Sequence, residues 1–148
     1  MYSVQSSFGK IVPALAASVA PGSLTSTAVI AEYAVIAERV DVQRLAVVVS
    51  TAVVSTGAVV VTVRSRPTVG SATGQSTITT LTIPAGTAAG KVVYKDINQA
   101  NLLPGGSIAF EVTTASAGGG AAGAVVCGMV IAEDPEDKRN ESAFIASA

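Results

Sequence analysis

The sequence predicts an all-β protein, an antiparallel sandwich of two sheets with about seven to eight strands. Runs of Val, Ile and Thr recur along the chain and are separated by turn-forming Gly, Pro, Ser and Asn. Within several runs, apolar and polar residues alternate with the period of two that a half-buried strand shows. Hydrophobic residues make up 49% of the chain but aromatic residues only 4%, so small side chains must fill the core, as suits closely packed sheets.

The chain divides into three regions. Its 148 residues are enough for one core, and the strand-like runs lie between residues 24 and 132. Residues 1–23 are rich in Ser, Ala and Pro and show no sustained period, so we expect an extended N-terminal arm. Residues 133–148 begin with the charged spacer Glu133–Glu141 and end in small apolar residues, so we expect a solvated tail with a docking tip. An acidic lure for a basic partner is the alternative interpretation of the spacer.

Six segments have the pattern of strands. In the stretch after Gly106, alternation predicts that Ile108, Phe110 and Val112 point inward and that Glu111 and Thr113 point outward. The nearly continuous apolar run Arg44–Val54 predicts a central strand that is covered on both faces. The remaining strands are expected at Gly57–Pro67, Thr77–Ile83 (before the turn Pro84-Ala85-Gly86), Lys91–Ile97 and Ala124–Ile131.

The segment Ala28–Arg39 fits both a helix and a strand. A helix would align Val29, Tyr33, Ile36 and Val40, whereas a strand would place Val29, Ala31, Tyr33 and Val35 on one side. We favour one or two strands, because Val and Ile are frequent in the segment and its neighbours are strands.

Several functional classes lack the residues that they need. The chain has no histidine, which removes the commonest general base and metal ligand. Cys127 is the only cysteine, so neither an intramolecular disulfide nor a zinc cluster can form. Nine Lys and Arg residues and a net charge of -1 leave little electrostatic attraction for nucleic acid. We therefore expect no catalytic site, no cofactor, no metal and no direct nucleic-acid binding.

Two weak chemical signals have plainer interpretations. Gly118, Gly120 and Gly123 match the spacing of a dinucleotide-binding loop, but a strand rather than a helix is expected to follow them, so we read a flexible hairpin. Two carboxylates could cleave a glycoside, but charges on solvent-facing strand positions are the favoured interpretation of the spaced acids Glu32, Glu38, Asp41, Asp96 and Glu111.

No membrane span is expected. The uncharged stretch Ile11–Ala31 is interrupted by Pro13 and Pro21, and Val112–Ala132 contains Gly118, Gly119, Gly120 and Gly123.

Candidate partner contacts fall in the two arms and on one strand. The apolar side chains of the arms cannot build a core of their own and should be buried against another surface: Phe8, Ile11, Val12, Leu15, Phe144 and Ile145. Arg64 and Arg66 lie two residues apart on one strand face, where they could contact an acidic partner. The alternative is that these arginines protect a strand edge or keep the protein soluble.

Three segments carry a resemblance to a known family. Gly57-Ala-Val-Val-Val-Thr-Val-Arg64, Ala89-Gly-Lys-Val-Val-Tyr94 and Leu103-Pro-Gly-Gly-Ser-Ile-Ala-Phe-Glu-Val112 resemble small jelly-roll proteins of tailed-phage virions, especially capsid decoration or cement proteins. The resemblance covers about residues 24–132 and is one of texture, without an invariant motif.

The resemblance implies a jelly-roll-like sandwich that is made in the host cytoplasm and resides in the virion. Such a protein binds the major capsid protein and stabilises the head shell without turnover, as a homo-oligomer for which a trimer is favoured. Two alternatives stay open. One is a β-sandwich recognition module for carbohydrates or receptors, although this would need exposed aromatic platforms and the chain has no Trp. The other is a fibre or tail accessory component of the virion.

Overall fold

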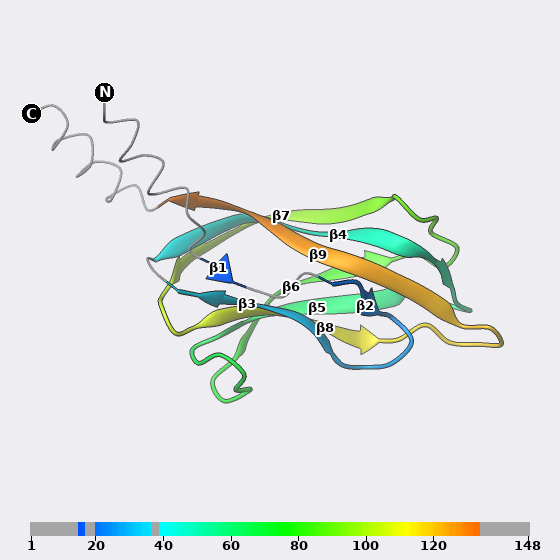
Figure 1. Ribbon diagram of the computed structural model, residues 1–148, viewed down its shortest axis with the longest axis horizontal. Helices are drawn as coiled ribbons and strands as arrows, with labels where there is room; N and C mark the ends of the chain where they lie inside the picture. Colours follow the sequence, from blue (N-terminus) through cyan, green and yellow to red (C-terminus); the bar gives the residue numbers. More distant parts are fainter. Residues whose placement is uncertain (1–14, 17–19, 37–38, 134–148) are drawn as a thin grey trace, which may run out of the picture.

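Two antiparallel β-sheets pack face to face as a sandwich (Figure 1). The computed structural model describes residues 15–16, 20–36 and 39–133, and these residues contain no helix. The all-β, two-sheet fold predicted from the sequence is therefore confirmed. The strands are β1 (Leu15–Ala16), β2 (Gly22–Ser23), β3 (Val29–Val35), β4 (Val40–Val54), β5 (Val59–Arg66), β6 (Ser76–Ile83), β7 (Val92–Leu102), β8 (Ser107–Thr114) and β9 (Ala122–Glu133).

The strand order explains how the sandwich is wound. One sheet has the order β1-β3-β8-β5-β6 and the other has the order β2-β9-β4-β7. Three strand pairs are nested in the sequence: β5 pairs with β6, β4 with β7, and β3 with β8. Successive pairs alternate between the two sheets, as they do when one long hairpin rolls up on itself. This nesting is the jelly-roll-like feature of the fold.

The core lies between the sheets and is made mostly of Val, Leu and Ile. Strand β8 shows how alternation builds it: Ile108, Phe110 and Val112 are fully buried, whereas Thr113 is exposed and Glu111 is half-buried. The facing predicted for this strand is confirmed. The other core residues are Leu24, Val35, Val40, Val42, Leu45, Val47, Val49, Val53, Val59, Val61, Val63, Leu81, Ile83, Leu102, Val125 and Cys127.

The ambiguous segment forms a strand. Residues 29–35 are β3, and Tyr33 and Val35 point toward the core as the strand interpretation requires. Val29 does not, because the register with β8 shifts between Val29 and Ala31. Ile30 packs against the core instead, and Val29 is 40% exposed.

The prediction for Arg44–Val54 is half right. It forms β4, which lies centrally between β9 and β7 as expected. Its outer face, however, is not covered by any described part of the chain, and Val48 is 41% exposed there. The strand carries apolar residues on both faces, but only Leu45, Val47 and their neighbours on the inner face are buried.

Part of the predicted N-terminal arm belongs to the sandwich. Leu15 pairs with Val35 in β1, and Gly22 pairs with Val125 in β2. A side chain at position 22 would place its Cβ 2.5 Å from Cβ of Ile30, so the close approach of β2 to β3 requires glycine. These two strands show no periodicity in the sequence, because each is only two residues long.

The glycine-rich loop is not the hairpin that we expected. It joins β8 of one sheet to β9 of the other, and the strand β9 follows it. Gly118 and Gly120 have φ values of 104° and 77°, and a Cβ at position 118 would lie 2.6 Å from Cγ2 of Thr56. Glycine here lets the chain cross between the sheets in a tight turn.

Among the described residues, no helix is long and apolar enough to cross a lipid bilayer.

Candidate interaction surface

The outer face of the four-stranded sheet carries an apolar surface on three neighbouring strands. Cross-strand pairing arranges it in three rows across β7, β4 and β9. We call this surface the apolar face, and its rows are Val92, Val48 and Val126; Tyr94, Ala46 and Gly128; and Asp96, Arg44 and Val130.

The large side chains of the apolar face are open to solvent. The exposed fractions are 41% for Val48, 55% for Val92, 54% for Tyr94 and 50% for Val130. In the middle row, Ala46 and Gly128 add little bulk beside Tyr94. Scattered single hydrophobic residues are ordinary on protein surfaces, whereas a contiguous patch marks a site of interaction.

The charged groups of the apolar face neutralise one another. Arg44 Nε lies 2.6 Å from Asp96 Oδ1, and the Arg44 guanidinium carbon lies 4.2 Å from the centre of the Tyr94 ring. The hydrogen bond between the two side chains raises the pKa of Arg44 and lowers the pKa of Asp96. The face therefore carries a balanced ion pair at its border and offers little steering for a partner of either charge.

The outer face of the five-stranded sheet is polar by contrast. Arg64 pairs with Glu111, and Thr62 Oγ1 lies 2.8 Å from Thr113 Oγ1. Thr80 and Thr82 on β6 are exposed. The outer face of the five-stranded sheet is thus mainly polar, whereas the outer face of the four-stranded sheet is mainly apolar.

Glu32 anchors the loop between β5 and β6 to this polar face. Its carboxylate accepts hydrogen bonds from the Gly70 N–H at 2.8 Å and from the Ser107 hydroxyl, and it lies 3.2 Å from Arg66 Nη1. Burial alone would raise the pKa of Glu32, but these hydrogen bonds and the charge of Arg66 outweigh it and hold the pKa below its ordinary value of 4.5. Glu32 is therefore a structural carboxylate that is ionised at neutral pH.

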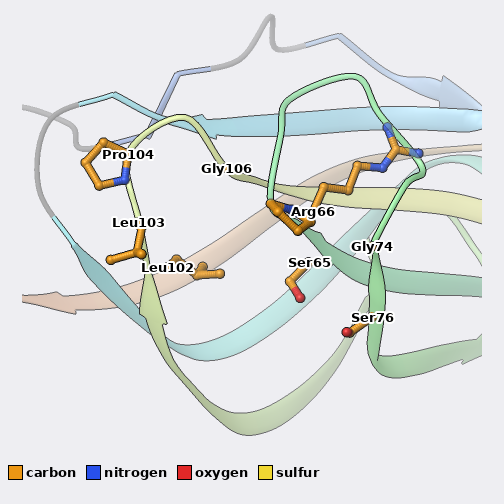
Figure 2. Close-up of a pocket in the computed structure, with 9 residues that line it drawn as sticks. Ser65, Arg66, Gly74, Ser76, Leu102, Leu103, Pro104 and Gly106 are labelled. Carbon is orange, nitrogen blue, oxygen red and sulfur yellow. The ribbon is translucent and has the colours of Figure 1, made fainter.

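A pocket of about 370 Å³ lies at the end of the sandwich where β5 ends and β6 begins (Figure 2). Leu102, Leu103 and Pro104 line one side of it, and Ser65 and Ser76 line the other. Among the described residues that line the pocket, the one ionisable side chain is Arg66, whose guanidinium is bonded to Glu32 and Gln75. The described lining of the pocket therefore offers no free general acid or base.

The thiol of the chain is buried, and three described carboxylates are each paired with an arginine. Burial raises the pKa of the Cys127 thiol to about 12, so the thiolate that a nucleophile needs is absent at neutral pH. In the described part of the chain, no three His, Cys, Asp or Glu side chains gather closely enough to hold a metal ion. Glu32, Asp96 and Glu111 each pair with a different arginine, and Glu38 lies outside the described residues.

The predicted partner residues have different outcomes. Arg64 and Arg66 do share the outer face of β5, but each is bonded to an acid of its own chain. Strand β5 lies between β8 and β6, so the alternative that these arginines protect a sheet edge is wrong. Leu15 lies in β1. The other predicted contacts, Phe8, Ile11, Val12, Phe144 and Ile145, lie outside the described residues.

The apolar face has a signal in the sequence, which predicts coverage of both faces of one strand. The continuous apolar run Arg44–Val54 correctly marked a strand with apolar residues on both faces. What covers the outer face could not be decided from the sequence, because burial by the same chain and burial by a partner give the same pattern.

No protein-family model, no curated protein and no solved structure matches the chain.

Proposed function

We propose that the protein is a virion structural protein, a capsid decoration protein that binds the shell of a phage head and stabilises it without catalysing a reaction. The outer face of the four-stranded sheet is the surface that docks on the major capsid protein. The observation that carries this proposal is the apolar face, on which Val48, Val92, Tyr94 and Val130 are exposed. The resemblance of the strand segments to decoration proteins supplies the class of partner.

The physical argument starts from the contrast between the two outer faces. A sandwich that is free in water keeps polar residues on both of its outer faces. Here the five-stranded sheet follows that rule and the four-stranded sheet does not. The charges of the apolar face are balanced by the Arg44–Asp96 pair, so the face fits a partner surface that is itself apolar and weakly charged.

The energy of one contact favours a repeated lattice as the partner. Burial of one half-exposed Val or Tyr contributes about 1 kcal/mol, so the four large side chains contribute about 4 kcal/mol. Association of two proteins costs about 4 kcal/mol or more in lost motional freedom. One apolar face alone therefore binds weakly, and stable attachment needs several linked contacts, which a shell with many equivalent sites provides.

The chemistry of the site argues against the carbohydrate-binding alternative. A sugar-binding platform needs an open aromatic ring, and Arg44 already lies over one face of the Tyr94 ring. A role in a fibre or tail remains the second candidate within the virion, since the apolar face would serve there equally well. Copy number separates the two roles.

Two measurements test the proposal. Quantitative mass spectrometry of purified particles should find the chain in numbers comparable to the major shell protein. A few copies for each particle would favour a tail or fibre role, and absence from particles would overturn the virion assignment.

The second measurement is cosedimentation of the purified protein with particles that lack it. Val92→Glu and Val130→Glu, both at exposed positions, should weaken binding at least tenfold because a charge must then be buried against the shell. Thr114→Glu, at an exposed position on the other sheet, is the matched control and should bind like the wild type. Equal binding of all the variants would show that the apolar face is not the docking surface.

A further inference from the structure

Strand β6 forms an edge of the five-stranded sheet and lacks the usual protection of an edge. Its eight residues, Ser76–Ile83, contain no charge, no proline and no glycine. Only β5 pairs with it, so no described part of the chain pairs with its other edge. Unpaired edges of this kind add further strands unless charges, prolines or bulges prevent it.

The strands at the other edges of the two sheets are short or charged. The edge strands β1 and β2 are two residues long, and β7 carries Lys95 and Asp96. In β6 the register with β5 shifts at one end, where Val63 pairs with Thr79 but Arg64 pairs with Thr77. Thr79–Ile83 is thus a regular, uncharged edge of five residues. The edge of β9 beyond β2 (residues 126–132) is also uncharged, but it contains Gly128 and its Cys127 carbonyl already accepts a hydrogen bond from Tyr33.

We propose that this edge pairs with β6 of a second copy of the chain, antiparallel and across a two-fold axis that passes midway between Leu81 of one copy and Leu81 of the other. Residues opposite one another in an antiparallel pair must point to the same face. One residue of the strand must therefore lie directly opposite its own symmetry mate, with the axis between them. An axis at Leu81 uses the regular segment alone. Each strand then completes the hydrogen-bonding edge of the other.

This register matches like side chains on both faces. On the outer face, Thr80 of each copy lies opposite Thr82 of the other, and cross-strand threonine pairs stabilise sheets. On the inner face, Leu81 lies opposite its own symmetry mate and Thr79 lies opposite Ile83. Because Leu81 and Ile83 belong to the core, the two cores become continuous across the pair. A self-pair also brings no like charges together, which pairing with β7 would risk.

The symmetry of the pair links it to docking. A two-fold axis perpendicular to the five-stranded sheet keeps both four-stranded sheets on the same side of the dimer. Both apolar faces then point in one direction, so the dimer can hold a flat surface at two places. The dimer compensates for the low affinity of a single apolar face, because linking two weak contacts raises the overall affinity without any new contact. The pair makes a dimer in place of the trimer that the family resemblance implies.

The test uses two double variants of the full chain with substitutions at the same two positions. Thr80→Lys with Thr82→Lys places two lysines opposite two lysines, about 5 Å apart at Cβ, and should weaken the dimer at least tenfold. Thr80→Lys with Thr82→Glu places each lysine opposite a glutamate and should retain the dimer. Thr114→Lys, exposed on β8 away from the edge, is the control for added charge. Sedimentation velocity over a concentration series gives the mass, and melting curves verify that each variant folds.

The proposal holds if the wild type, the Lys/Glu variant and the control are dimers while the Lys/Lys variant is a folded monomer. A wild type that is monomeric at its highest soluble concentration overturns it. So does any oligomer that the Lys/Lys variant leaves unchanged, because another surface then holds the copies together. A monomer whose β6 amides are protected from hydrogen exchange also overturns it, since a segment of the same chain then covers the edge. None of these results depends on particle binding, so the docking proposal stands or fails separately.

Discussion

The hydroxyl group of Tyr33 in β3 donates a hydrogen bond to the backbone carbonyl oxygen of Cys127 in β9 and thereby ties the two sheets together. Cys127 pairs with Val47. In β4, the N–H of Val49 donates a hydrogen bond to the carbonyl oxygen of Lys91, and its carbonyl oxygen accepts one from the N–H of Gly90, so both groups point toward β7. Backbone groups two residues apart in a strand point to the same side, so those of Val47 should also point toward β7. The carbonyl group of Cys127 therefore points away from β4, beyond the two-residue strand β2, and Tyr33 satisfies it.

Tyr33→Phe should destabilise the protein by about 1 to 2 kcal/mol, because it leaves this carbonyl group without its partner. The ring contact should survive, since the Tyr33 and Phe110 rings meet edge to face with centroids 5.9 Å apart. Urea unfolding measures the loss. Tyr94→Phe, at an exposed position, is the control, and an equal effect of the two changes would contradict a specific role for the Tyr33 hydroxyl.

Phe110→Ala should cost about 3 to 5 kcal/mol, because Phe110 is fully buried and its removal leaves a cavity between the sheets. The neighbouring change Glu111→Ala should cost about 1 kcal/mol or less, since it removes a partly exposed ion pair with Arg64. Thermal melts of both variants compare the two faces of β8. A larger loss for Glu111→Ala than for Phe110→Ala would be incompatible with the facing described above.

Glu32 should make the protein sensitive to acid. Its folded-state pKa lies below 4.5, so its contribution to stability is present above that pH and is lost as the pH falls through the lower folded value. The urea concentration at the unfolding midpoint, measured from neutral to acidic pH, should decrease once the pH is below about 4.5. The fall should be smaller in Glu32→Gln, which is also less stable at neutral pH because Arg66 loses its ion-pair partner. An unchanged acid response in that variant would assign the effect to other carboxylates.

Cys127 should resist alkylation in the folded protein. The thiol is buried and its pKa is raised to about 12, so at pH 8 iodoacetamide should react at least about a hundredfold more slowly than with an open thiol. Intact-mass measurements with and without urea show the difference. Rapid labelling of the native protein would mean that β9 opens readily near this residue.

The main strands could be predicted from the sequence because apolar and polar residues alternate in them. In β8, Ile108 and Glu111 have the facing that the alternation predicts. The sequence could not predict the register shift at Val29, because a bulge depends on the neighbouring strand rather than on local composition. Nor could it find β1 and β2, which are too short to show a period.

The site was harder to predict than the fold. Arg64 and Arg66 looked available to a partner because the sequence does not show that Glu111 and Glu32 lie beside them, on strands distant in the chain. The apolar face depends on the pairing of three strands, since Tyr94, Ala46 and Gly128 become neighbours only when β7, β4 and β9 align. A surface of this kind depends on which strands pair and in which register, and the sequence alone does not show this.

The nested pairing of the strands also sets an order in which the chain can fold. The β5–β6 pair closes a short loop, the β4–β7 pair encloses it, and the β3–β8 pair encloses both. Closing a long loop costs more chain entropy than closing a short one, so each inner pair lowers the cost of the next by bringing the flanking strands together. We expect folding to proceed outward from the β5–β6 hairpin and to be slow, because most contacts join distant parts of the chain. Substitutions in the hairpin, such as Val61→Ala, should then slow folding, whereas Val35→Ala in β3 should mainly speed unfolding. Stopped-flow kinetics in urea would separate the two effects, and the opposite assignment would place the folding nucleus at the outer strands.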